Sequence, residues 1–460
     1  MELVSNVVII GGGPGGYEAA LVAAQLGAKV ALVEATGVGG ATVLTDCVPS
    51  KTLIATSNLL VEVAGADQLG ITTTGKVAAD LAAVNRRVLE LATAQSNDIT
   101  ARLERDHIRI ISGTARLLSA DEVHVITSDG TEETLAADVV LVATGARPRE
   151  FAGATADGER ILNWKQLYEL NELPEHLIVV GSGVTGAEFA SAYQALGAQV
   201  TLVSSREHVL PGQDADAAQV LEEVFQRRGV NILSNTRMEK VKRTELGVKV
   251  ELTDGRVVTG SHCLLALGSV PNTTDLGLEA AGVALDDNGF IKVDRVSRTT
   301  ARGVYAAGDC TGVFMLASVA AMQGRIAMWH ALGDAVSPLN LSEVVSNVFT
   351  APEIATVGVT QEQIEDLEAG ADYLMLPISG NARAKMQGES DGFVKIFARR
   401  GTGTVIGGVV VASSASELIH PVSLAVSTGL TVDQLAHAFT VYPSNSGSIA
   451  EAARRMHKKH

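Results

Sequence analysis

The chain has 460 residues and a formal net charge of −16. At about 150 residues per domain, this length predicts about three domains. The acidic balance argues against nucleic acid as a partner, because phosphate binding depends on clustered Lys and Arg. The basic tail RRMHKKH is interpreted as a solvated helix end, which the helix dipole favours.

The composition is that of an α/β protein without a membrane segment. Hydrophobic residues make up 46% of the chain and aromatic residues 4%, while glycine occurs 46 times. The N-terminal stretch enters a strand directly, and no stretch reaches the ~20 apolar residues that span a bilayer. Three widely spaced cysteines fit a reducing compartment better than a disulfide framework. We therefore expect a cytoplasmic protein that does not insert stably into membranes.

The first predicted unit runs from Val7 to Glu34. It contains an apolar strand, a GxGxxG turn, an Ala-rich helix and a second strand, which together form a βαβ unit. Gly11 allows the tight turn, Gly13 lets backbone approach a pyrophosphate, and Gly16 permits close packing of helix on strand. Glu34 ends the second strand, where a carboxylate accepts hydrogen bonds from a ribose diol. This pattern predicts a nucleotide site, with the phosphates at the helix N-terminus.

A cysteine-containing segment, GGATVLTDCVPSK, follows at residues 39–51. It holds one cysteine, Cys47, and has Thr42 five residues upstream. A redox disulfide here needs a second thiol close by. Two interpretations of Cys47 stay open: a thiolate stabilised by the following helix N-terminus, or a residue that only packs well.

A second βαβ unit, Leu177 to Ser204, aligns with the first without a gap. Its turn carries the equivalent glycines Gly181, Gly183 and Gly186. Ser204 replaces the acidic residue of the first unit, which removes the charge that would repel a 2′-phosphate. Arg206 would neutralise such a phosphate, although Glu207 beside it argues against this. The second site therefore accepts NADPH, NADH or both.

Along nearly its full length the chain resembles the flavoprotein disulfide reductases, the family of dihydrolipoyl dehydrogenase and glutathione reductase. The matching motifs follow one another in the family's order: GGGPGGYEAA, CVPSK, VVLVATGARP, VVGSGVTGAEFA, LLALGSVPN, VYAAGDC, MLAS, VFTAPEIATVGVT, NARAK and GFVKIF. The resemblance implies an α/β fold with two Rossmann-like dinucleotide-binding domains and an α+β dimerisation domain. The FAD domain would comprise 1–150 and 280–345, the NAD(P)H domain 151–279, and the interface domain 346–460. The last would form a homodimer, possibly a larger assembly.

The resemblance also implies roles for matching residues. Asp309 would hydrogen-bond the ribityl chain of FAD, and Thr144 and Gly145 would lie near its adenosine half. The helix that begins at 315–318 would stabilise negative charge on the reduced flavin. The positions expected at the FAD site are Gly11, Gly13, Gly15, Gly16, Glu34, Gly40, Thr42, Lys51, Thr144, Gly145, Asp309, Met315, Leu316, Ala317 and Ser318. Those expected at the NAD(P)H site are Gly181, Gly183, Thr185, Gly186, Glu188, Ser204, Arg206 and Gly268.

Two remaining cysteines and one lysine complete this set. Lys51 would lie near flavin N5 and pair with Glu188, because a buried lysine and a buried glutamate are tolerable only together. Cys263 lies in an apolar run and is expected in a buried strand, while Cys310 would pack near the FAD. The sequence has no His and Cys cluster with metal-ligand spacing, so we expect no metal.

The chain departs from the family where disulfide chemistry takes place. Thr42 stands in place of the first redox cysteine, and a hydroxyl can neither form nor attack a disulfide. Near the C-terminus, Tyr442 and Gly447 replace the histidine and glutamate of the HPxxxE motif. Tyrosine is a poor proton shuttle at neutral pH, and His437 is expected to be a surface helix residue rather than a substitute. We therefore do not expect lipoamide or glutathione disulfide reduction.

The FAD and NAD(P)H motifs that the chain keeps predict hydride transfer from NAD(P)H to flavin N5 and then direct reduction of a quinone. This pattern resembles an actinobacterial branch of the family, described as NAD(P)H:quinone reductases. The expected catalytic residues are Lys51, Glu188, Cys47 and Tyr442. Tyr442, contributed across the dimer interface, either contacts the acceptor or fills the vacated pocket.

Three alternatives remain open. One is a peroxide or oxygen reductase that works through a Cys47 sulfenate. Another is a pyridine nucleotide transhydrogenase, although that branch of the family keeps the histidine. The third is a non-enzymatic flavin redox sensor that binds another protein.

Overall fold

The structure is a computed structural model that describes residues 4–72, 74–75, 77–366 and 370–457. The chain divides into two compact units, and each is formed by three separate stretches of sequence. Unit one comprises residues 1–52, 85–149 and 267–340, and unit two comprises 53–84, 150–266 and 341–460. Two helices, α3 (Cys47–Ala64) and α4 (Leu81–Arg105), run across the boundaries between these stretches.

Unit one is built on a seven-stranded sheet with an antiparallel extension. The strand order is β17 (Val304–Ala306), β6 (Val139–Val142), β1 (Asn6–Ile10), β2 (Lys29–Glu34), β3 (Arg109–Leu117), β4 (Glu122–Thr127) and β5 (Glu132–Ala136). The strands from β17 to β3 are parallel, whereas β4 and β5 pair antiparallel. A separate ribbon joins β7 (Ala146–Pro148) to β16 (Ser269–Pro271).

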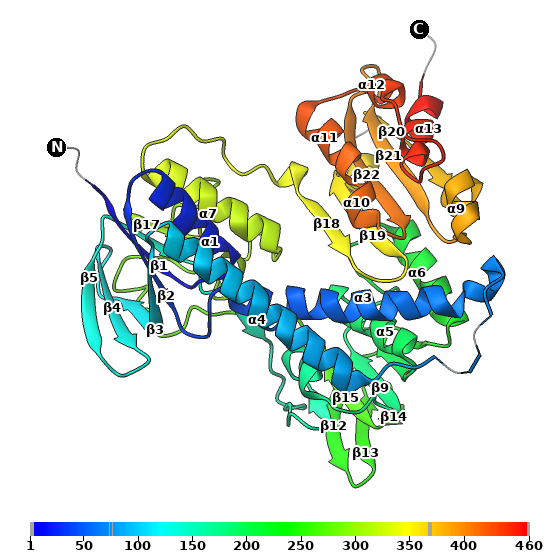
Figure 1. The fold of residues 1–460 in the computed structure, drawn as a ribbon, viewed down its shortest axis with the longest axis horizontal. Coiled ribbons are helices and arrows are strands. Elements are labelled where there is room, and N and C mark those ends of the chain that lie inside the picture. Colours follow the sequence, from blue (N-terminus) through cyan, green and yellow to red (C-terminus); the bar gives the residue numbers. More distant parts are fainter. Residues whose placement is uncertain (1–3, 73, 76, 367–369, 458–460) are drawn as a thin grey trace. The chain divides into compact units, whose positions relative to one another are not determined.

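The apolar run of β1 is buried on both faces, as parallel strands require. Val7 and Ile9 enter a core cluster with α1 (Pro14–Gln25) and α7 (Ala317–Ala331), and Val8 and Ile10 enter a second cluster on the other face. Helices α1 and α7 lie side by side (Figure 1). A Cβ added to Gly324 would lie 2.0 Å from the carbonyl oxygen of Gly15, so these helices meet backbone to backbone.

Unit two contains a second parallel sheet and a small antiparallel sheet. The parallel sheet has the order β11 (Asn231–Leu233), β10 (Gln199–Val203), β9 (His176–Val180), β15 (His262–Leu265) and β8 (Ile161–Leu162). Its helices include α5 (Val184–Leu196) and α6 (Ala215–Arg227). The antiparallel sheet comprises β12 (Met238–Thr244), β13 (Gly247–Leu252) and β14 (Val257–Gly260).

The C-terminal part of unit two is an antiparallel sheet covered by short helices. Its strand order is β18 (Val345–Val348), β19 (Glu353–Gly358), β22 (Val405–Ala412), β21 (Phe393–Arg399) and β20 (Ala371–Pro377). The helices are α8 (Gln361–Asp366), α9 (Ala382–Gln387), α10 (Ala415–Leu418), α11 (His420–Thr428), α12 (Val432–His437) and α13 (Gly447–Arg455). Arg454 and Arg455, in the last turn of α13, each bond to Glu451 at 2.7 Å.

These elements confirm the predicted α/β fold and both predicted βαβ units. The first is β1–α1–β2 and the second is β9–α5–β10, each with two parallel strands around one helix. The two-unit division does not test the predicted domain boundaries, which remain a prediction. Within the described ranges, no helix combines the length and apolar character needed to cross a membrane.

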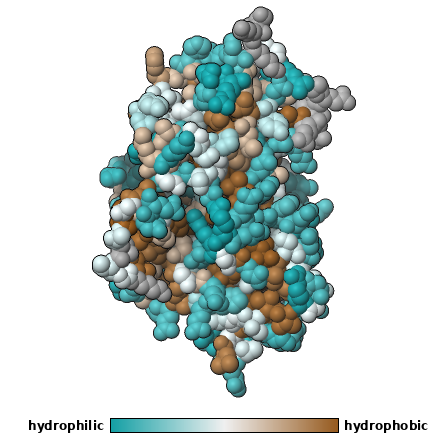
Figure 2. Space-filling view, turned by 90° about the vertical axis from the view of Figure 1, so that its right-hand side faces the viewer, coloured by the Kyte–Doolittle hydropathy of each residue, from teal (hydrophilic) through white to brown (hydrophobic). Residues whose placement is uncertain are grey.

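Large apolar side chains remain exposed on unit two. One face of the molecule shows hydrophobic residues among hydrophilic ones (Figure 2). The segment after α12 has the most exposed aromatic side chains, with Phe439 at 107% and Tyr442 at 87% of full exposure, beside Val441 at 76%. Three large apolar side chains within four residues are therefore exposed here.

Acid should weaken unit two through His262 on β15. This residue is 8% exposed, and its Nδ1 lies 3.0 Å from Ser261 Oγ. Burial, together with nearby Arg160, lowers the pKa of His262 to about 4. The folded state therefore favours the neutral ring. This stabilisation is complete above the unfolded pKa of about 6.5 and is lost as pH falls toward 4.

We therefore expect a His262→Gln variant to lose less thermal stability than the wild type between pH 7 and pH 4.5. The difference in Tm change should be on the order of 3 °C in calorimetry. Equal losses of Tm for both proteins would show that His262 does not govern this acid sensitivity.

Candidate functional site

In both glycine-rich turns the first and third glycines are required by the protein's own backbone. Gly11 has φ +104°, and a Cβ on Gly16 would lie 1.8 Å from the Gly11 carbonyl oxygen. Gly181 has φ +108°, and a Cβ on Gly186 would lie 1.8 Å from the Gly181 carbonyl oxygen. The tight turn and the close helix–strand approach are therefore the same in the two units.

The middle glycines have no such structural reason. Gly13 and Gly183 both have φ −70°, a conformation open to any residue. The nearest described atom to a Cβ on Gly13 would be the Gly39 oxygen at 4.0 Å, and for Gly183 no described atom lies within 4 Å. The space beside both residues fits a ligand whose phosphates approach the backbone closely.

Three long helices begin without a side-chain cap from any described residue. They are α1 after Gly13, α5 after Gly183, and α7 after Leu316. Surface helix α6 differs, because Asp214 Oδ1 accepts a hydrogen bond from the Ala217 N–H at 3.2 Å. In α1, Pro14 has no N–H and the Gly16 N–H donates to the Gly13 oxygen at 2.9 Å. No described side chain accepts from the other first-turn N–H groups of α1, α5 and α7, which suits anionic groups from outside the chain.

Glu34 lies beside the first glycine-rich turn at the end of β2. One carboxylate oxygen accepts the Gly12 N–H at 2.5 Å, and the other accepts the Thr36 N–H and hydroxyl at 2.7 and 2.9 Å. These three bonds fix the carboxylate and leave about one of its four lone-pair sites for a ribose hydroxyl.

Ser204 occupies the matching position in the second unit and makes a different contact. It is buried, its Oγ lies 2.8 Å from Ser182 Oγ, and it accepts the Arg206 N–H at 3.1 Å. Ser182 is itself the counterpart of Gly12 in the first unit. A neutral hydroxyl pair has therefore replaced the amide–carboxylate contact, and the Arg206 side chain remains exposed.

The cysteine-containing segment adjoins the first glycine-rich turn. The Gly39 N–H donates to the Gly12 oxygen at 2.8 Å, and a Cβ on Gly40 would lie 2.9 Å from Gly13 Cα. Thr42 lies in α2 (Gly40–Leu44), and the partly buried Cys47 begins α3. Thr42 and Cys47 thus follow shortly after the two glycines that contact the first glycine-rich turn.

Asp309 also belongs to this region of unit one. Burial and the nearby charge of Asp46 raise the pKa of Asp309 to about 6. Asp46 directly precedes Cys47, so the carboxyl of Asp309 is electrostatically coupled to the start of α3.

Thr144 is held by a residue that sequence reasoning did not assign to the site. Its Oγ1 donates to the backbone oxygen of Asn272 at 2.7 Å, and the Asn272 side chain donates to the Thr144 oxygen at 2.9 Å. Gly145 follows with φ +67°. In the sequence, Asn272 is the last residue of the LLALGSVPN motif. This motif resembles the family as a whole, and the pattern assigns no separate role to Asn272.

The other predicted catalytic residues are divided between the units. Glu188 is 3% exposed on α5, and its Oε1 accepts the Phe349 N–H at 2.9 Å. Lys51 is half-buried on α3 in unit one, so its pairing with Glu188 stays a prediction. Tyr442 lies in the exposed segment after α12. At the remaining predicted positions, Thr185 is half-buried, and Gly268 and Met315 are exposed.

The other two cysteines are buried thiols. Cys263 is fully buried on β15, as predicted, and burial raises its pKa. Burial raises the pKa of Cys310 to about 11, and its thiol donates to the Ala307 oxygen at 3.3 Å. Neither thiol is poised to react. His437 is exposed at the end of α12, as predicted. Among the described residues, no group of three or more His, Cys, Asp or Glu side chains is arranged to hold a metal.

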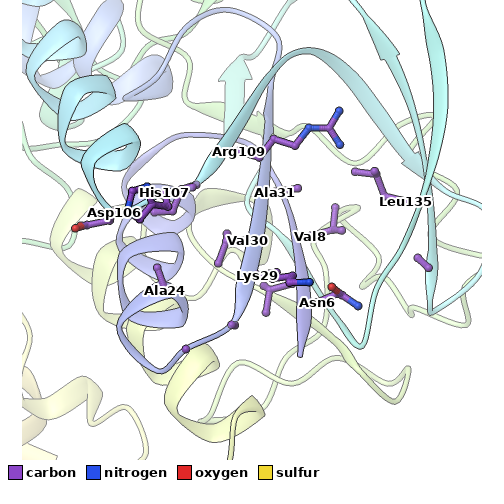
Figure 3. Close-up of a pocket in the computed structure, with 15 residues that line it drawn as sticks. Asn6, Val8, Ala24, Lys29, Val30, Ala31, Asp106, His107, Arg109 and Leu135 are labelled. Atoms are coloured by element: carbon purple, nitrogen blue, oxygen red, sulfur yellow. The ribbon is translucent and has the colours of Figure 1, made fainter. Parts of the chain in front are cut away.

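A cavity of about 530 Å³ lies at the opposite, amino-terminal edge of the unit-one sheet (Figure 3). Asn6, Lys29 and Arg109, which begin β1, β2 and β3, line it together with His107. Arg109 pairs with Glu133 at 2.7 Å. None of the 15 lining residues is a position to which the sequence assigns a role.

Comparison with known proteins agrees with this geometry. Residues 5–324 match the model of the pyridine nucleotide-disulphide oxidoreductases, and residues 344–453 match the dimerisation domain of the same family. A Mycobacterium tuberculosis protein named NAD(P)H dehydrogenase (quinone) is 55% identical over 99% of this chain and 94% of its own length.

Two further proteins extend the comparison. The crystal structure of LpdA from Mycobacterium tuberculosis has a TM-score of 0.95 and 55% identity, covering 99% of this chain and all of that one. The dihydrolipoyl dehydrogenase of Zymomonas mobilis is 33% identical over 97% of both chains. The chain therefore belongs to the pyridine nucleotide-disulphide oxidoreductase family.

Proposed function

We propose that this protein is an FAD-dependent NAD(P)H:quinone oxidoreductase. The observation that carries the proposal is the combination of two complete dinucleotide-binding turns with Thr42 in place of the first redox cysteine. The turns supply uncapped helix N-termini and open space at Gly13 and Gly183. The name of the Mycobacterium tuberculosis relative supports the same electron donor and acceptor.

When bound, FAD supplies the chemistry that passes two electrons from a nicotinamide nucleotide to an acceptor. The residues fitted to hold it are those around the first turn. The first turn of α1 would hold its phosphates, Glu34 would accept a hydrogen bond from its ribose, and Asp309 would accept one from its ribityl chain. The N-terminus of α7 would stabilise negative charge on its ring. Lys51, which the family resemblance pairs with Glu188, would lie near flavin N5 and help to shape the site of hydride transfer.

The second turn receives the electron donor, which we take to be either NADH or NADPH. Ser204 removes a carboxylate from the ribose position, and a hydrogen bond to the Glu222 carboxylate raises the pKa of His208 in the same loop. Arg206 favours a 2′-phosphate, whereas Glu207 opposes it. This balance suits a site that accepts both nucleotides.

The class of electron acceptor is inferred from the absence of the first redox cysteine. A threonine cannot carry electrons between flavin and substrate, so a planar quinone takes them at the flavin directly. We propose a cytoplasmic homodimer, built from the FAD, NAD(P)H and interface domains that the family resemblance implies. The exposed segment 439–442 forms part of its interface, so that Tyr442 reaches the acceptor site of the partner subunit.

Replacing the middle glycine should separate nucleotide binding from folding. We expect Gly183→Ala to raise the KM for NAD(P)H on the order of tenfold, the equivalent of one lost hydrogen bond to a charged group. The Tm and the FAD content should stay unchanged, because a Cβ at Gly183 meets no described atom. Gly380→Ala, at an exposed glycine with similarly open surroundings, is the matched control. An unchanged KM for Gly183→Ala would remove this site from nucleotide binding.

FAD should bind less tightly in acid because of Asp309. Its pKa is raised to about 6, and the ionised carboxylate is the form that would accept a hydrogen bond from FAD. We expect affinity to fall by up to about tenfold per pH unit below pH 6. Flavin fluorescence on dilution of the holoenzyme at pH 5 and pH 7.5 measures this release. If Asp309→Asn shows the same pH dependence as the wild type, another group is responsible.

Although Cys47 is among the residues expected at the catalytic site, direct transfer from flavin to quinone makes its thiol dispensable for quinone reduction. We expect Cys47→Ser to retain at least about half of the wild-type kcat with a quinone, within the ±0.5 kcal/mol typical of a substitution outside the reacting groups. Lipoamide should be reduced by neither protein. Steady-state assays under argon, normalised to bound FAD, give the comparison. Loss of quinone turnover in Cys47→Ser would refute direct transfer, and loss confined to peroxide turnover would support the sulfenate alternative.

A further inference from the structure

Lys395 on β21 is a fully buried cation with a complete set of partners. Its side chain is 0% exposed, and its Nζ donates to both Asp214 oxygens at 2.9 and 2.8 Å. It also donates to Asp216 at 2.5 Å and to Gln361 Oε1 at 2.8 Å. The rings of Tyr373, Phe393 and Phe397 lie 5.4 to 6.0 Å from the ammonium. Burying an ammonium is costly, so the structure depends on this geometry being maintained.

Asp214 joins this cluster to helix α6. While both its oxygens accept from Lys395, Oδ1 also accepts the Ala217 N–H and caps the helix. The other end of α6 is attached as well, since Arg227 pairs with Asp391 at 2.5 Å. Arg228, the next residue, donates to the Ala351 oxygen at 2.9 Å. The position of α6 is thus set by the C-terminal antiparallel sheet and its connections.

The loop 204–213, between β10 and α6, depends on α6 in turn. Glu222 of α6 accepts the Val209 N–H at 2.7 Å with one oxygen, and its other oxygen lies 3.1 Å from His208 Nδ1. The loop also contacts Ser182, whose backbone oxygen accepts the Leu210 N–H at 2.8 Å. The loop is therefore held between the second glycine-rich turn and α6.

This loop contains Ser204 and Arg206, the residues expected at the adenosine end of the electron donor. A shift of the first turn of α6 would move Glu222 and, with it, the backbone at His208 and Val209. The alternative, that the cluster only stabilises the fold, predicts no selective effect on nucleotide affinity. The continuous bonding from β21 to the loop favours a functional link.

We propose that Lys395 is a positioning residue for the adenosine end of the NAD(P)H site, acting through Asp214 and α6. It does not itself contact the nucleotide. The inference rests on the proposed function only in taking NAD(P)H as the electron donor. Because the effect concerns nucleotide affinity, it does not depend on which acceptor receives the electrons.

Lys395→Met tests this role, since it keeps the length of the side chain and removes the charge. Asp214 and Asp216 then repel each other without compensation, and the start of α6 shifts. We expect the Kd of NADP⁺ for the oxidised holoenzyme, measured by calorimetry, to rise roughly tenfold. The KM for NADPH should rise in parallel while kcat at saturating NADPH changes less than about twofold. Lys249→Met, at a half-exposed lysine on β13, is the matched control and should leave both constants unchanged.

Asp216→Ala tests the same cluster with less risk to folding, because Asp216 is 42% exposed. Its Kd for NADP⁺ should rise about two- to threefold. Glu222→Ala should reproduce the Lys395→Met effect, and the double variant should show less than the sum of the two, because both act on one loop.

A Lys395→Met protein with lowered Tm but a Kd for NADP⁺ within twofold of wild type would overturn the inference, and so would an unchanged Kd in Asp216→Ala. If instead the wild type failed to reduce quinones, the proposed function would fall. The comparison of NADP⁺ affinities would still decide the role of Lys395.

Discussion

The close approach of helix to strand at the two glycine-rich turns is the constraint on which the rest of the structure depends. Gly16 and Gly186 each lie so near a backbone oxygen that no side chain fits. This contact brings the N-termini of α1 and α5 to the carboxyl ends of β1 and β9, where no described side chain caps them. Free N–H donors beside an open glycine form an anion site before any ligand arrives.

The two βαβ units differ at the residue that ends or follows the second strand, and we propose that each binds a different nucleotide. In the proposed function, the Glu34 carboxylate would bind a nucleotide with a free ribose, and the Ser204 hydroxyl would tolerate a phosphorylated one. In the proposed reaction, the electron path from the flavin to the acceptor differs from that of disulfide-reducing relatives, because Thr42 cannot carry electrons. What remains is a donor site and a flavin site whose acceptor must approach the flavin itself.

Much of this arrangement could be predicted from sequence, because local patterns encode it. The strand–turn–helix pattern gave both βαβ units, and the apolar run around Cys263 gave its buried strand. The sequence did not predict the contacts between residues that lie far apart in the chain. Asn272 and Thr144 are 128 positions apart, and Lys395 and Asp214 are 181 apart. GFVKIF reads as an ordinary buried strand, and only the fold shows that its lysine has carboxylate partners on another element.

The central claim is that electrons pass to a quinone without a sulfur relay. The most direct measurement reduces the wild type and Cys47→Ser anaerobically with one equivalent of NADPH, and then mixes each with a quinone in a stopped-flow spectrophotometer. The account predicts that the oxidised flavin spectrum returns at similar rates in both proteins, and faster with quinone than with lipoamide, peroxide or NAD⁺. Reoxidation that requires Cys47, with a disulfide to that residue forming and breaking during turnover, would contradict it.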